Sequence, residues 1–211
     1  MALITMRQAI TDALREEMHR DERVFIMGEE VGVWGGTYAV TRGFYDEFGE
    51  KRVRDTPISE MAIGGVAAGA AMGGLRPVAE FMTINFAFLA LDAIINHAAK
   101  IHYMFGEQMR VPVVYRAPGG GGRQLGATHS HTPDVIFGHF PGLKVVSPST
   151  PYDAKGLLKS AIRTDDPVLF IEHHTLYQIR GEVPAEEYVV PIGVSEVKRP
   201  GDAVTLVGYA Q

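Results

Sequence analysis

The sequence predicts an α/β fold in which a parallel sheet carries helices on both faces. Two patterns carry this prediction. Helical segments and short apolar segments alternate along residues 6–175. The apolar segments are also continuous rather than alternating, which is typical of strands covered on both sides. In such folds the loops at the carboxyl ends of the strands carry the functional site.

The first helix and strand are clear from spacing. Met6, Ile10, Leu14 and Met18 recur every four residues, which predicts a helix with one apolar stripe that ends near Asp21. The apolar run at 24–27 then predicts a buried strand, and the glycine-rich stretch at 32–36 predicts a loop.

The next helix, at 60–74, is unusual in being built almost entirely from small residues. It contains Gly64, Gly65, Gly69 and Gly73, and each glycine costs a helix about 1 kcal/mol relative to alanine. We therefore expect another backbone to approach this helix closely.

The remaining elements follow in the same alternation. The sequence predicts strands at 78–82, 111–115, 144–147 and 168–172, and helices at 86–105 and 153–163. Residues 1–175 thus form one α/β domain. Residues 176–202 are expected to be an extended linker, and residues 203–211 to be the first strand of a second, truncated domain.

Composition excludes several classes of function. The 20 basic and 25 acidic residues give a net charge of −5 without charged runs, so a nucleic acid partner is not expected. Because the chain has no cysteine, disulfides and thiolate chemistry are excluded.

The amino terminus lacks the features of a secretory signal. The longest apolar stretch, 86–91, is far shorter than the roughly 20 residues of a membrane span, so we expect a cytoplasmic protein.

Three histidines within eleven residues raise the possibility of a metal site. His129 and His131 could present two imidazoles to zinc, but no third ligand stands at a suitable distance from them or from His139. A hydrogen-bonding loop histidine, or an acid or base in a cleft, remains the commoner outcome. The glycines at 119–122 lack the spacing of a nucleotide-binding loop and fit a mobile connection or a ligand-facing loop.

Glu60 has two interpretations. It directly follows Ser59, so it could simply stabilise the positive end of the helix. Alternatively, it is a buried carboxylate that shares a proton with a ligand nitrogen, for which Met61, Met82 and Phe86 could supply the apolar surroundings.

Four motifs in order carry a family resemblance. They are Asp55-Thr-Pro-Ile-Ser-Glu60, Arg76-Pro-Val-Ala-Glu-Phe-Met-Thr-Ile-Asn-Phe86, His129-Ser-His-Thr-Pro133 and Pro141-Gly-Leu-Lys-Val-Val-Ser-Pro148. With the small-residue helix, they resemble the beta subunits of thiamine-diphosphate-dependent 2-oxo acid dehydrogenases, the pyruvate dehydrogenases above all. The resemblance covers residues 6–210, and it implies a pyrimidine-binding α/β domain. Subunits of this family continue beyond the position of Gln211.

The resemblance implies roles for five residues. Glu60 matches the glutamate that contacts the aminopyrimidine nitrogen of the cofactor and promotes loss of the thiazolium proton. Phe86 matches the aromatic residue that stacks on the pyrimidine, Met82 an apolar wall, and Glu29 an acidic residue near the cofactor. His129 matches a catalytic histidine at the mouth of the site, linked to the oxo acid or acyl-transfer steps.

Two further features come from the same resemblance. His131 stands where glutamine is common in the family, which affects substrate contact or partner recognition. The family also holds a structural potassium ion, and the matching positions here are Val113, Ala161, Ile162, Thr164 and Asp166.

The motif that binds magnesium and diphosphate in this family, Gly-Asp-Gly, is missing, since Gly201-Asp202 stands in another context. The resemblance therefore implies that an alpha subunit supplies the magnesium site in a heterotetramer of two alpha and two beta subunits. The implied reaction is oxidative decarboxylation of a 2-oxo acid, pyruvate first, with acetyl transfer to a lipoyl domain of the acyltransferase component. Branched-chain 2-oxo acid and acetoin dehydrogenases, a non-catalytic assembly module and a metal hydrolase are the alternatives.

Overall fold

The computed structural model describes residues 1–211 and is built around a six-stranded sheet. The strand order is β3-β2-β4-β5-β7-β6, and every neighbouring pair is parallel. The strands are β2 (Val24–Gly28), β3 (Val53–Asp55), β4 (Arg76–Glu80), β5 (Val114–Gly119), β6 (Lys144–Val146) and β7 (Val168–His173). The parallel sheet predicted from the sequence is confirmed, although β3 was not expected.

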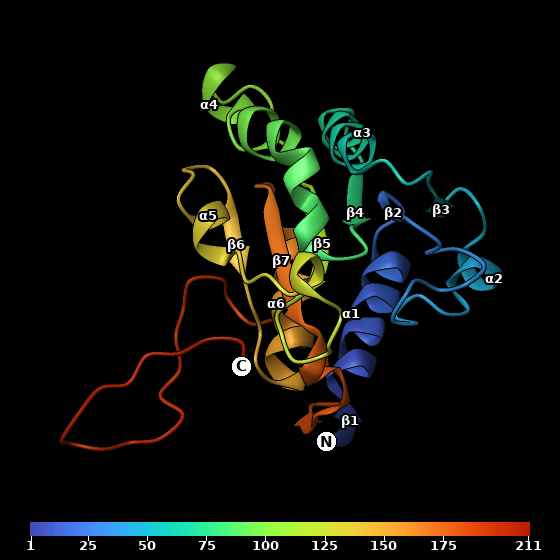
Figure 1. Ribbon diagram of the computed structural model, residues 1–211. Helices are drawn as coiled ribbons and strands as arrows, with labels where there is room; N and C mark the ends of the chain where they lie inside the picture. The colour runs from blue at the N-terminus through green and yellow to red at the C-terminus, as the bar shows by residue number, and fades with distance from the viewer.

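Helices cover both faces of this sheet (Figure 1). On one face α1 (Met6–Arg20) packs against α6 (Pro151–Arg163). On the other face α3 (Glu60–Met72) packs against the 3₁₀ segment η1 (Ile84–Ala90) and the π-helical segment η2 (Asp92–Ala98), which leads into α4 (Ile101–Met104). Two separate apolar cores result, one on each side of the sheet.

The region predicted as a single helix at 86–105 is instead three helical segments. The chain bends by 59° between η1 and the segment that follows it. The bend accompanies close packing on α3, because a methyl group added at Gly64 would lie 2.9 Å from Ala90 Cβ and 3.3 Å from Ala93 Cβ. Tertiary packing thus outweighs the simple helical pattern here. Of the α3 glycines, Gly65 and Gly69 face open space.

Smaller elements complete the domain. They are α2 (Phe44–Phe48), η3 (Ala127–His129), α5 (Asp134–Gly138), η4 (His174–Gln178), β1 (Ala2–Thr5) and β8 (Arg180–Val183). β1 and β8 pair antiparallel. Because Leu176, Tyr177 and Val183 are buried, the packed unit extends to Val183, eight residues beyond the boundary expected at 175.

The strand expected at residues 203–211 is not formed. This segment is largely exposed, with no neighbouring strand, and in Figure 1 the chain before it swings out from the domain and then returns, so that the C-terminus lies beside α6. A strand is defined by hydrogen bonds to a partner strand, so an apolar pattern alone does not produce one.

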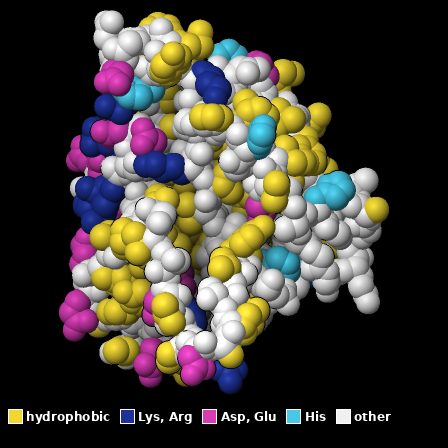
Figure 2. All heavy atoms as spheres, turned by 90° about the vertical axis from the view of Figure 1, so that its left-hand side faces the viewer, with side chains coloured by type: hydrophobic (Ala, Val, Ile, Leu, Met, Phe, Trp, Pro, Cys, Tyr) yellow, Lys and Arg dark blue, Asp and Glu magenta, His cyan; other side chains and the backbone are white.

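No single helix is long and apolar enough to cross a membrane, although the bent pair at 84–90 and 92–104 has the length and composition of a broken span. Its residues Ile84, Ala87 and Ile94 are buried in the core. Figure 2 shows acidic and basic side chains interleaved along one margin of the face that it presents, without a block of either sign.

Candidate active site

Residues singled out in the sequence meet at the carboxyl edge of the sheet. Glu29 directly follows β2, and Glu60 opens α3 after β3. Met82 follows β4, and His129 lies in the loop after β5. Because these strands are parallel, all four residues leave the sheet at the same edge.

Glu29 is a buried carboxylate that lacks a full set of partners. It is 4% exposed, and its Oε1 has no hydrogen-bond partner. Burial raises the pKa of the Glu29 carboxyl above its ordinary value, and the negative charges of Glu60, Glu80 and Glu30 raise it further. Such an orphaned buried oxygen marks a position where a ligand or water completes the site.

Glu60 is buried as well, at 5% exposed, although it stands in the first turn of α3. No basic side chain forms an ion pair with it. The Ser59 side chain does not cap the helix. A carboxylate that merely faced the helix dipole would normally remain in water, so burial favours the second interpretation, a carboxylate that contacts a ligand.

An aromatic residue and a histidine stand together in the same region. The rings of Phe86 and His129 meet edge to face, with centroids 5.1 Å apart and planes at 84°. Thr128 Oγ1 lies 3.0 Å from His129 Nδ1, which orients the imidazole. Phe86, His129 and Met82 are each half-buried, so part of each side chain remains accessible.

His131 is held by a residue that the sequence analysis missed. Asn85 Nδ2 lies 2.6 Å from His131 Nδ1, and Thr83 donates a hydrogen bond to Asn85 Oδ1 at 3.0 Å. Thr83 and Asn85 are buried. Two polar residues inside the apolar stretch at 81–91 were the signal that could have revealed them.

Together these side chains fit an aminopyrimidine ring. Glu29 and Glu60 offer acceptors to its N–H groups, and the half-buried ring of Phe86 offers a stacking surface. These two carboxylates and the aromatic ring therefore suit the pyrimidine half of thiamine diphosphate.

The metal sites considered from the sequence find less support. No three His, Asp or Glu side chains come together as a metal site, and His129 and His131 have the separate partners described above. At the expected potassium positions, the carbonyl oxygens of Ile162 and Thr164 each accept a hydrogen bond from Arg76 Nη1 at 2.9 Å. Lys144 lies 2.8 Å from Asp166 Oδ2. The fit to potassium is poor because cationic side chains already occupy these oxygens, and we assign it no role.

Val113 and Ala161, the other two expected potassium positions, are structural. Val113 accepts a hydrogen bond from the backbone of Val168 at 2.9 Å, and Ala161 is buried in the core between α1 and α6.

A buried charge cluster behind the site also escaped the sequence analysis. Arg116 donates hydrogen bonds to Glu80 and to both carboxylate oxygens of Glu172, and Tyr177 donates to Glu172. Burial raises the pKa of Glu80, Arg116 lowers it, and Glu172 raises it again. Charged residues within otherwise apolar strands were the signal for this cluster.

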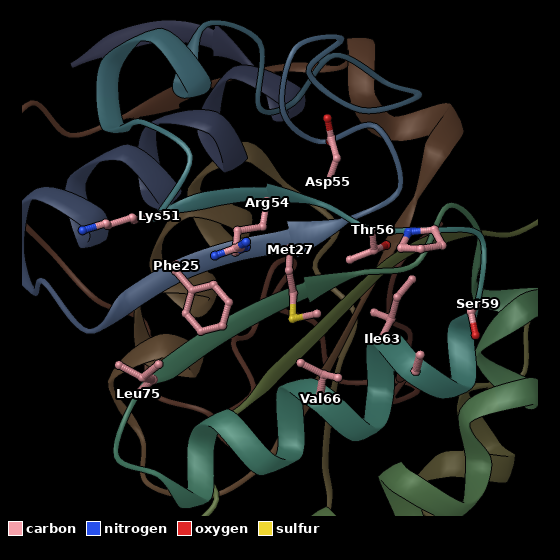
Figure 3. Close-up of a pocket in the computed structure, with 12 residues that line it drawn as sticks. Phe25, Met27, Lys51, Arg54, Asp55, Thr56, Ser59, Ile63, Val66 and Leu75 are labelled. Atoms are coloured by element: carbon pink, nitrogen blue, oxygen red, sulfur yellow. The ribbon is translucent and has the colours of Figure 1, made fainter.

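A separate apolar cavity of about 450 Å³ lies between α3 and the β2–β3 edge of the sheet. Figure 3 shows Phe25 and Met27 facing Ile63 and Val66 across it, whereas the Asp55 carboxylate points away. None of the five active-site residues predicted from the sequence lines this cavity, so it is distinct from the candidate site.

Comparison with known proteins agrees with this geometry. Residues 2–180 match the family described as transketolase, pyrimidine binding domain. The chain is 52% identical over 210 residues to the 2-oxoisovalerate dehydrogenase subunit beta of Bacillus subtilis, covering 99% of this chain and 64% of that protein. It is 47% identical to the mitochondrial pyruvate dehydrogenase E1 component subunit beta of Bos taurus, covering 99% of this chain and 59% of that protein. These relatives confirm the resemblance based on the sequence motifs, and the chain spans about 60% of their length.

Solved structures share the fold. A split-gene transketolase described as an inactive beta4 tetramer matches with a TM-score of 0.63 and 24% identity, covering 80% of this chain and 50% of that one. Transketolase from Leishmania mexicana matches with a TM-score of 0.67 and 19% identity, covering 89% and 27%. With a parallel sheet, two buried carboxylates at its carboxyl edge and a family match over most of its length, the chain belongs to the transketolase pyrimidine-binding domain family.

Proposed function

We propose that the chain is the pyrimidine-binding part of the beta subunit of a pyruvate dehydrogenase. The observation that carries this proposal is the pair of buried carboxylates, Glu29 and Glu60, which have no cationic partner and lie at the edge of the sheet where Phe86 and His129 meet. In a protein interior, uncompensated carboxylates of this kind are costly unless a ligand contacts them.

Each side chain has a defined task in this proposal. Glu60 holds a proton shared with the pyrimidine nitrogen, and Phe86 stacks on the ring. Met82 closes the apolar side, and Glu29 stands nearby with a raised pKa. His129 orients the oxo acid or the acyl acceptor at the mouth of the site. Thiamine diphosphate, when bound, supplies the electron sink for decarboxylation.

A partner subunit completes the proposed site. The chain has no motif for magnesium and diphosphate, so an alpha subunit would supply that half in a heterotetramer of two alpha and two beta subunits. A lipoyl domain of an acyltransferase component would then receive the acetyl group. We place the proposed reaction in the cytoplasm.

Pyruvate and branched-chain 2-oxo acids are both candidate substrates. Relatives named for pyruvate are more numerous at 47–51% identity, whereas the relative named for 2-oxoisovalerate is 52% identical. The size of the substrate pocket distinguishes such substrates. One methylene group more or less in a hydrophobic pocket changes kcat/KM by roughly 10- to 200-fold.

The test is co-purification of the full subunit with candidate alpha subunits, followed by thiamine-dependent decarboxylation of pyruvate and 2-oxoisovalerate, with thiamine-dependent cleavage of acetoin measured separately. A higher kcat/KM for pyruvate is the expected result. A preference for 2-oxoisovalerate would replace pyruvate dehydrogenase with the branched-chain enzyme. Complex formation without any decarboxylation would instead assign a non-catalytic assembly role.

A further inference from the structure

We propose that the chain has a second ligand site, an oxyanion-binding cavity between Arg7 and Arg123. This Arg7–Arg123 cavity has a volume of about 400 Å³ and is also lined by Tyr38, His174, Thr175 and Gln178. No acidic residue lines it. It shares no residue with the set Glu29, Glu60, Met82, Phe86 and His129, and the inference does not depend on the proposed function.

The positive charge of this cavity is uncompensated. Neither Arg7 nor Arg123 forms an ion pair with a carboxylate. Arg7 also stands in the first turn of α1, which contains no acidic residue. The amino-terminal end of a helix carries partial positive charge and is stabilised by an anion. A cationic side chain at this position increases the local positive charge, so a bound anion would be stabilised further.

His174 forms a buried part of the cavity wall. The residue is only 4% exposed, and its Nε2 has no hydrogen-bond partner. Buried nitrogens are normally satisfied by protein, water or ligand. The backbone of Gly119 and Gly121 lies beside the imidazole, so His174 is a fixed, buried part of the cavity wall.

Tyr38 holds the Arg123 guanidinium in place before any ligand binds. The rings of Tyr38 and His174 stack with centroids 6.4 Å apart at 11°, and the Arg123 guanidinium lies 5.5 Å from the centre of the Tyr38 ring. An arginine placed over an aromatic face loses less freedom on binding a ligand. The cavity is therefore organised rather than a chance gap between flexible side chains.

The buried acids near this site, Glu172 and Glu80, are both paired with Arg116. Tyr177, another residue of the wall, donates its hydroxyl hydrogen bond to Glu172. That carboxylate is already paired with Arg116, whose Nη2 lies 2.7 Å from Glu172 Oε2. Arg7 and Arg123 are consequently left for an external anion.

The donor set defines the class of ligand. Guanidinium groups bind carboxylate and phosphate oxygens through paired N–H donors, and Gln178 adds a neutral polar side chain to the lining. A volume of about 400 Å³ falls within the range of small-molecule sites. The ligand is thus a carboxylated or phosphorylated metabolite of small size.

Isothermal titration calorimetry on the purified full subunit, together with any subunit that co-purifies with it, tests the proposal. Inorganic phosphate and malonate are the two probes, with sodium chloride at matched ionic strength as the background. Arg123→Gln and the double variant Arg7→Gln/Arg123→Gln are compared with Arg199→Gln. The control removes an exposed arginine that does not line the cavity.

We expect saturable binding of at least one probe and a loss of affinity of about 10- to 100-fold in Arg123→Gln, as for loss of a charged hydrogen bond. Arg199→Gln should bind as the wild type does. Preference for phosphate or for malonate identifies the phosphorylated or the carboxylated class, and either supports the site. Absence of saturable binding, or equal affinity in the double variant and the wild type, would overturn the proposal. Circular dichroism establishes that the variants are folded.

Discussion

Arg116 Nη2 lies 2.7 Å from Glu172 Oε2, and both side chains are completely buried in the sheet, on neighbouring strands. The same guanidinium also contacts Glu80 on β4. One cation thus serves two buried carboxylates across three adjacent strands. A buried pair adds little net stability, but removing one partner leaves an uncompensated charge.

Replacing Arg116 with methionine should therefore destabilise the domain by about 3 to 5 kcal/mol, the typical cost of breaking a buried ion pair. Urea denaturation measures the free energy of unfolding. Arg110→Met is the control, because Arg110 and its partner Asp166 are both exposed, and exposed pairs contribute about 1 kcal/mol or less. Equal losses in the two variants would contradict a special role for the buried cluster.

Glu29 should make the protein less stable as the pH rises. Burial, followed by the charges of Glu60, Glu80 and Glu30, raises the pKa of this carboxyl in the folded state. A raised carboxyl pKa means that the folded state holds the proton more tightly than the unfolded chain does. The resulting stability is complete below the ordinary carboxyl pKa of about 4.3 and is lost as the pH rises through the folded-state value.

The variant Glu29→Gln removes this titration, so its free energy of unfolding should fall less than that of the wild type between about pH 4 and neutral pH. Denaturation curves at several pH values give the comparison. Glu50→Gln, at an exposed position whose charge does not contribute to the raised pKa of Glu29, is the control and should retain the wild-type slope. A wild-type slope in Glu29→Gln would show that Glu29 is not the group responsible.

Glu60→Gln should abolish thiamine-dependent turnover in the assembled enzyme while the domain remains folded. An amide cannot share a proton with the pyrimidine nitrogen, and loss of an acid or base contact costs about 10²-fold or more in rate. Steady-state decarboxylation measures the effect, with the exposed Glu50→Gln again as the control. Turnover within a few-fold of the wild type would remove Glu60 from the mechanism.

Phe86→Ala should weaken cofactor binding more than it slows the chemical step. The substitution removes a stacking surface worth about 0.5 to 1.5 kcal/mol beyond its buried area, which corresponds to a loss of affinity of roughly 2- to 13-fold. The apparent affinity for thiamine diphosphate is the quantity to measure. Phe105→Ala removes an exposed ring elsewhere and should leave the affinity unchanged. If both variants bind equally well, another side chain forms the stacking surface.

The comparison of sequence and structure separates local from non-local information. The α1 helix and the β2 strand could be predicted because their apolar spacing is set within a few residues. The break between η1 and η2 could not, because it depends on contact with Gly64, more than 20 residues away. For the same reason, the short β1 strand could not be predicted, because it depends on pairing with β8, which lies at the other end of the domain sequence.

Site residues follow the same division. Motifs identified Glu60 and Phe86, and the structure shows the first buried and the second beside His129. The Arg116 cluster and the Asn85–His131 contact join residues that are far apart in the sequence. Only folding of the strands and loops brings their polar groups together.

The glycines of α3 differ in their surroundings, which gives a matched pair of substitutions. A methyl group at Gly64 would lie 2.9 Å from Ala90 Cβ, whereas one at Gly65 would meet nothing within 4 Å. In addition, Tyr115 donates a hydrogen bond to the Gly64 carbonyl at 3.0 Å, so a shift of the helix at this position would disturb a buried contact.

Gly64→Ala and Gly65→Ala should therefore change stability in opposite directions. Alanine in place of glycine favours a helix by about 0.5 to 1 kcal/mol, and at Gly65 this gain should appear undiminished. At Gly64 the extra methyl group overpacks the contact with η1 at a cost of about 1 to 3 kcal/mol, which outweighs the gain. Urea denaturation of the two variants measures both effects. A change of the same sign in both would mean that α3 can move away from η1 freely, and that the close approach does not require glycine at position 64.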